Sequence, residues 1–279
     1  REIIVASTTA SDAFGSVRRL SAETMRDRII HRESLKHFTL RGEATQRLDA
    51  MSDGVFALAI AMLLLSSSVP QHFQELLDFV YDAVPFFVCM LFVFWIWQEQ
   101  ATFFLRYGIY DGKATRLNFV LLFFVLFYVF PLKFLMSWML KYFALVLGWL
   151  TIDKSYATEI RALGEVISWD NVPILMLIYG IGFVSIFGVL WLMYRYALQK
   201  KGILKLTDIE TLETQLKIAQ QGICVFAGSL SCSLAIIGIV FNLYWVGAFL
   251  AGVVYNLVWI LMIPRVRQYQ RKLEILLKK

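Results

Sequence analysis

Six apolar stretches, each long enough to cross a lipid bilayer, dominate this chain of 279 residues. A membrane-spanning helix needs about 20 mostly apolar residues. The sequence offers such runs at about 53–69, 84–104, 117–131, 172–198, 221–241 and 244–263, and the third continues less cleanly past Lys133 to Leu150. With 59% hydrophobic and 17% charged residues, the chain has too much apolar surface for one soluble core of this size. We therefore predict an all-α membrane protein with six transmembrane helices per chain.

The distribution of Lys and Arg predicts which way these spans run, because cytoplasmic loops carry an excess of basic residues. Of the 27 Lys and Arg residues, 23 flank the predicted spans on one side of the membrane. The other side has only four: Lys133, Lys141, Lys154 and Arg161. The loop between the first two spans has three acidic residues, Glu75, Asp78 and Asp82. We expect both termini to be cytoplasmic. This asymmetry explains the net charge of +6 without a nucleic-acid partner.

The spans divide the chain into three predicted parts: a cytoplasmic N-terminal arm over 1–46, a six-helix transmembrane domain over 47–264, and a basic cytoplasmic tail over 265–279. The arm is mostly polar and lacks the long apolar core of a signal peptide. It contains Arg18-Arg19-Leu20-Ser21, which resembles a site for a basic-directed kinase, although a solvated arm explains the same residues.

Polar side chains mark the predicted cytoplasmic ends of the first three spans. Such groups are costly in a bilayer and are usually buried within protein or near water. They are Ser52 and Asp53 in the first span, Gln98 and Glu99 in the second, and Asn118 in the third. We expect them to form one cluster, with Arg47 as its counter-charge. Two roles stay open: the cluster locks the three helices together and caps the first, with Ser52 or Asp53 as the cap, or it handles ions directly.

Beyond this cluster the first span is uniformly apolar, and Leu58, Ala61, Met62 and Leu65 share one helical face. Taken alone, such a face is typical of a helix that contacts lipid or a neighbouring helix. Nothing in the sequence predicts an enzyme, because it has no Gly-rich phosphate loop, no H-E-x-x-H and no G-x-S-x-G. The three cysteines lie in apolar stretches without a histidine partner, so we expect no metal and no cofactor.

The segment from Arg47 to Leu65, RLDAMSDGVFALAIAMLLL, resembles the signature helix of the transmembrane protein 175 family of potassium channels. Arg47, Ser52, Asp53 and Gly54 match the family pattern, and Met51 stands where phenylalanine is usual. The family's second and third helices resemble the segments around Phe94-Trp95 and Leu117-Asn118. Gln98 and Glu99 replace residues that are often histidine there.

The resemblance implies a potassium channel without a carbonyl-type selectivity filter, in which the first helices line a central pore. Leu58 would form the main hydrophobic constriction, with Met62 and Leu65 in layers beyond it. Ala61 stands where a threonine is common, which implies a weaker preference for potassium over sodium. The residues that would hold the pore helix in place are Arg47, Ser52, Asp53, Trp95 and Asn118.

One copy of this helix per chain cannot enclose a pore, and the resemblance implies a homotetramer in a bacterial plasma membrane. The partners would be the lipid bilayer and permeant monovalent cations. Two other functions stay open. An ion-coupled secondary transporter would use Glu99 and Asp53, although the spans lack the paired broken helices common in transporters. A scaffold protein would act through its basic N-terminal arm.

Overall fold

The computed structural model describes residues 38–42, 46–65, 71–81, 83–149 and 171–277. The chain divides into two compact units, 1–39 and 40–279. The first unit, with the Arg18–Ser21 segment, lies almost entirely outside the described residues, and the following description concerns the second. Pro70, which follows the predicted first span, is also outside them.

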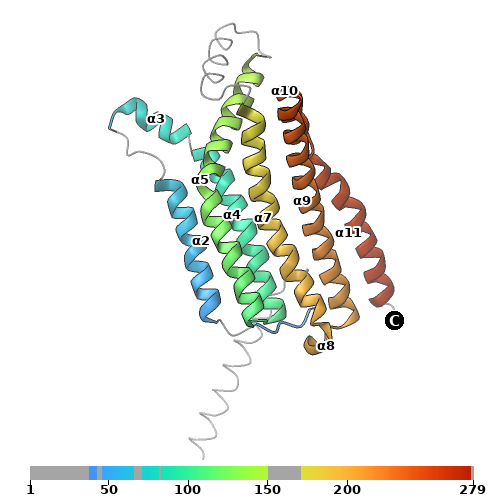
Figure 1. Cartoon of the computed structure of the whole chain (residues 1–279). Coiled ribbons are helices and arrows are strands. Elements are labelled where there is room, and N and C mark those ends of the chain that lie inside the picture. Colours follow the sequence, from blue (N-terminus) through green and yellow to red (C-terminus); the bar gives the residue numbers. More distant parts are fainter. Residues whose placement is uncertain (1–37, 43–45, 66–70, 82, 150–170, 278–279) are drawn as a thin grey trace, which may run out of the picture. The chain divides into compact units, whose positions relative to one another are not determined.

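Every regular element among the described residues of the second unit is a helix (Figure 1). Its elements are α2 (Arg47–Leu65), α3 (Phe73–Tyr81), α4 (Ala83–Tyr107), α5 (Gly112–Trp149), α7 (Val172–Gln199), α8 (Lys201–Leu204), α9 (Asp208–Val240), α10 (Tyr244–Val253) and α11 (Asn256–Leu277). Six helical segments of this part are long and apolar enough to cross a membrane: α2, α4, the first part of α5, α7, α9, and α10 with α11. The predicted fold class is therefore confirmed.

The starts of α2 and α9 differ from those predicted, each for a local reason. Helix α2 begins at Arg47 rather than Asp53, because the Asp49 carboxylate accepts the backbone N–H of Gln46, 3.0 Å away, and so satisfies a donor at the helix start. Ser52 and Asp53 therefore lie inside the helix and do not cap it. Helix α9 begins at Asp208 rather than near 221, since Thr207 and Glu210 form a reciprocal capping box.

The sixth span is interrupted and then continues further than predicted. A turn at Val254 and Tyr255 separates α10 from α11, with backbone bonds from Tyr255 to Gly252 and from Leu257 to Val254. Helix α11 runs through Pro264 to Leu277, so the predicted end at Ile263 is corrected. Proline is tolerated in membrane helices because neighbouring groups satisfy the backbone that it frees.

The spans pack in two groups. Helices α2, α4 and α5 contact one another, while α9 packs against α7, α10 and α11, and α5 joins the groups through α7. Helices α2 and α11 lie at opposite edges of this unit (Figure 1). The start of α2 and the last residues of α4 and α11 lie on the same side of the unit as α8 (Figure 1). We call this side the α8 end.

Two close approaches depend on glycine. A Cβ built on Gly247 of α10 would lie 2.6 Å from the Cα of Gly238 in α9, so the backbones of these helices touch. This contact closes the tight connection 241–243, and it agrees with the small residues of the last span. Gly108 follows α4 with a left-handed backbone (φ +58), and a Cβ there would lie 2.5 Å from the Arg41 carbonyl oxygen.

Ion pairs join the helices at the α8 end. Arg41 forms a bidentate pair with the buried Glu210 of α9, at 2.9 and 3.0 Å. Arg106 of α4 lies 3.3 Å from Glu213 of α9, and both are buried. Lys200 and Tyr196 both donate to Asp111, which also accepts the Ala114 backbone N–H at the start of α5. The chain before α2 is thus tied to the bundle at Arg41, a residue within the range of the predicted N-terminal arm.

Candidate pore helix and its polar contacts

Helix α2 has two faces with different environments. Ser52, Phe56, Ala59 and Leu63 form the face buried against α4 and α5. The residues predicted to line a pore lie elsewhere around the helix: Leu58 is 51% exposed, Leu65 is 78% exposed, Ala61 is exposed and Met62 is half-buried. Within one chain, the predicted pore face is therefore turned away from the helices that hold α2.

A chain of hydrogen bonds fixes the buried face of α2 to its two neighbours. The Asn118 amide of α5 donates to the Ser52 hydroxyl at 2.8 Å, and Ser52 donates to the Leu48 carbonyl at 2.8 Å. The Gln100 amide of α4 donates to the Asn118 carbonyl oxygen at 3.0 Å. Ser52 and Asn118 are fully buried and Gln100 nearly so. Because such groups are costly to leave unpaired, this chain favours one packing of the three helices.

Two acidic residues of α2 accept hydrogen bonds from aromatic side chains. The Trp97 indole of α4 donates to Asp53 at 2.7 Å, and the Tyr110 hydroxyl donates to Asp49 at 2.7 Å. Both contacts lie at the α8 end, where α2 begins. They orient α2, and neither carboxylate forms an ion pair with a described residue.

The other residues predicted for this cluster lie apart from it. Arg47 is exposed and pairs with no carboxylate among the described residues, so it is not the counter-charge of Asp53. Gly54 is exposed, and a Cβ built there would meet nothing within 4 Å in this part of the chain. The Trp95 ring packs 5.1 Å from the Phe187 ring of α7. The Gln98 side chain is half-buried and forms no hydrogen bond with the residues described.

Glu99 belongs to a second polar cluster, between α4, α7 and α9, which we call the Glu99 cluster. Its carboxylate pairs with the Lys217 ammonium at 2.6 Å and accepts the Tyr194 hydroxyl at 3.2 Å and the Gln221 amide at 3.3 Å. The prediction of a single cluster is therefore wrong. Successive helical residues point about 100° apart, so Glu99 and Gln100 face different neighbours.

The described structure also contains functional contacts that sequence reasoning missed. The contacts of Trp97 and Gln100 were among them. These two residues lie three apart on α4 and therefore share a helical face, and this spacing was the sequence signal for a common polar surface. Lys133 of α5 is 9% exposed and donates to the Leu63 carbonyl of α2 at 3.1 Å. A lysine inside an apolar helix indicates a buried hydrogen-bond partner, and this was the sequence signal for the contact with Leu63. No group of three or more metal-binding side chains gathers within the described residues.

These helices and contacts define an all-helical, multi-pass membrane protein. The protein-family model described as endosomal/lysosomal potassium channel TMEM175 matches residues 47–128. A potassium channel of Marivirga tractuosa is 35% identical over 207 residues, which cover 74% of this chain and 78% of the relative. The chain belongs to the TMEM175 family.

A solved structure shows the same relationship. A variant of the potassium channel MtTMEM175, crystallised with a nanobody–MBP fusion protein, superimposes with a TM-score of 0.71 at 34% identity. The match covers 85% of this chain and 98% of the other. A lysosomal potassium-selective channel TMEM175 homolog from Chamaesiphon minutus aligns over 80% of this chain and 96% of its own, with a TM-score of 0.46 and 19% identity.

Proposed function

We propose that this chain is a potassium channel whose central pore is lined by α2 from four identical copies. The observation that carries this proposal is the division of α2 into two faces. One face is buried against α4 and α5, while Leu58 and Leu65 are exposed on the other. A bilayer-spanning helix presented in this way has an apolar surface free to meet copies of itself around an axis.

We further propose that Leu58 forms the narrowest ring of the pore, with Met62 and Leu65 in successive rings. Hydrophobic constrictions gate channels by losing their water. Ala61 lies between these layers and offers no hydroxyl to a passing ion, so we expect the preference for potassium over sodium to be modest. The contacts of Ser52, Asp53 and Lys133 would hold each α2 at a fixed distance from the axis.

The polar contacts favour a channel over an ion-coupled transporter. A transporter would use Asp53 and Glu99 together, yet Asp53 accepts from Trp97 while Glu99 pairs with Lys217 in a different cluster. A carboxylate already paired with an ammonium is poorly suited to exchange a proton or sodium ion in each transport cycle.

We also propose that the protein resides in a bacterial plasma membrane with both termini in the cytoplasm. The support is the distribution of basic residues, of which the α8 end and the segments beyond it carry most. The acidic loop after α2 would then face outward and raise the local concentration of cations at the pore entrance.

The test is potassium and sodium flux into liposomes that contain the purified protein. Leu58→Ala should change the potassium flux and the ratio of the two ions, because it widens the narrowest ring. Leu64→Ala is the matched control: Leu64 is 48% exposed but lies about 120° around the helix from Leu58. Equal effects of the two substitutions would exclude this pore face, and folded protein without flux under any gradient would exclude a channel.

A further inference from the structure

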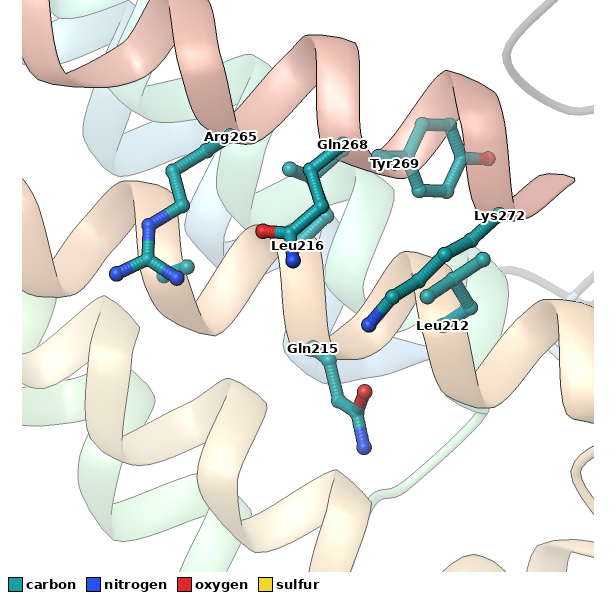
Figure 2. A pocket seen from close by; sticks show the side chains of 8 residues that line it. Leu212, Gln215, Leu216, Arg265, Gln268, Tyr269 and Lys272 are labelled. Carbon is teal, nitrogen blue, oxygen red and sulfur yellow. The ribbon is translucent and has the colours of Figure 1, made fainter.

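A narrow groove of about 110 Å³ lies between α9 and α11, near the α8 end (Figure 2). Figure 2 shows Arg265 and Lys272 extending from α11 toward α9, with Gln268 between them. Leu212, Gln215 and Leu216 of α9 lie opposite. The channel function proposed above makes no use of this groove.

The groove is cationic, and its cations are available to a ligand. It has no carboxylate among its lining residues. Arg265 and Lys272 are exposed and form no ion pair within the described part of the chain. The Tyr269 hydroxyl beside them donates to Glu213 at 3.0 Å, and that carboxylate is buried against Arg106. Two free cations and side-chain amides form an arrangement suited to a phosphate.

Apolar surface adjoins these cations. Ile260, Ile263 and Pro264 line a second groove of α11, of about 380 Å³, together with Arg267 and Arg271. Gln268 borders both grooves. Helix α11 therefore changes from apolar to basic within about two turns, at the level where a membrane helix meets the headgroups. A phospholipid has the same sequence of parts, with acyl chains followed by a phosphate.

We propose that the groove between α9 and α11 binds the phosphate of an anionic phospholipid, whose acyl chains pass Gln268 and enter the second groove of α11. Arg265 and Lys272 contact the phosphate, and Gln215 and Gln268 supply further hydrogen bonds. Basic pockets between membrane helices are suited to such headgroups. The adjoining apolar surface favours a lipid over free phosphate.

The test is binding of phosphatidylglycerol to the purified full chain in detergent, measured by native mass spectrometry against phosphatidylcholine. Each cation near a headgroup contributes about a fivefold gain in affinity, so Arg265→Gln with Lys272→Gln should weaken binding about 30-fold. Arg265→Lys with Lys272→Arg should retain it. The matched control, Lys113→Gln with Arg116→Gln, removes two cations elsewhere at the α8 end and should leave it unchanged.

Three results would overturn the proposal. Phosphatidylcholine binding as tightly as phosphatidylglycerol would show that the cations do not select the lipid. An unchanged affinity in the Arg265 and Lys272 double variant, with its melting temperature preserved, would place the lipid elsewhere. Inorganic phosphate binding as tightly as the lipid would make the groove a site for free anions. Binding is measured without flux, so this test stands apart from that of the channel.

Discussion

The Lys133 ammonium of α5 donates a hydrogen bond to the Leu63 carbonyl of α2, 3.1 Å away. Leu63 lies in the last described turn of α2, on the face that is buried against α4 and α5. In an apolar surrounding no water replaces a missing donor. Lys133 thus fixes one end of α2, while Asp49, Ser52 and Asp53 fix the other.

Lys133→Met should loosen the docking of α2. A hydrogen bond to a charged group contributes about 1.5–3 kcal/mol, so we expect a lower melting temperature in detergent and an altered potassium flux. Lys133→Arg keeps a donor and should remain close to the wild type. Lys201→Met removes an exposed cation of α8 and should change stability by less than about 0.5 kcal/mol. A Lys133→Met protein as stable as the Lys201→Met control would contradict this role.

Gln98 and Gln100 offer a comparison of the same residue type on one helix. Gln100→Leu leaves the buried Asn118 oxygen without its donor and should cost about 1–3 kcal/mol of stability. Gln98→Leu removes no such bond and should change stability by less than about 0.5 kcal/mol. Thermal unfolding of both variants, followed by tryptophan fluorescence, measures the difference. If Gln98→Leu proves the more harmful, the assignment of the polar chain through Gln100 is wrong.

The Glu99 cluster should support structure rather than conduction. Glu99→Gln leaves Lys217 without its partner and should cost about 1–3 kcal/mol, since Lys217 is partly exposed and the solvent moderates the loss. Adding Lys217→Gln should recover part of that stability, which a double-mutant cycle quantifies. Potassium flux should persist in Glu99→Gln. Saturable transport that this substitution abolishes would instead favour a coupled transporter.

Asp111 predicts a dependence of stability on pH. Desolvation alone would raise its pKa, but the hydrogen bonds from Lys200 and Tyr196 outweigh desolvation and lower the pKa to about 2. Because the pKa of Asp111 is lower in the folded protein, its ionised carboxylate stabilises the fold at a pH above the unfolded pKa of about 3.9. This contribution disappears as the pH falls toward 2. Asp111→Asn should therefore melt below the wild type at neutral pH.

The gap between these two melting temperatures should close between about pH 4 and pH 2, as the wild-type carboxylate becomes protonated. Melting curves of both proteins across that range measure it. Because Asp111 is about one-third exposed, we expect a gap equivalent to less than about 1 kcal/mol. A gap that stays constant down to pH 2 would show that the ionised carboxylate is not the stabilising form.

Apolar length and helical periodicity predicted the spans well. The six apolar runs correspond to six membrane-length helices, and the spacing of Leu58, Ala61, Met62 and Leu65 places them away from the buried stripe of α2. These features depend on local composition and on the period of the helix, both of which a single sequence displays.

The partners of the polar residues were harder to predict, because they depend on how each helix is rotated against its neighbours. Gln98, Glu99 and Gln100 are consecutive, yet only Gln100 faces Asn118, while Glu99 faces Lys217 from a helix more than 100 residues away. Helix ends in polar sequence were missed for a related reason. The first turns of α9 are too polar to suggest a membrane helix, and only the capping box at Thr207 marks their start.

The contact between Gly238 and Gly247 has a consequence for how the chain enters the membrane. The connection 241–243 is far too short to cross a bilayer about 30 Å thick, so α9 and the helices that follow must insert together as one hairpin. The start of α9 and the end of α11 are therefore confined to the same compartment, whatever the charges around them. A reporter fused to the C-terminus would reveal the compartment of α8 as well.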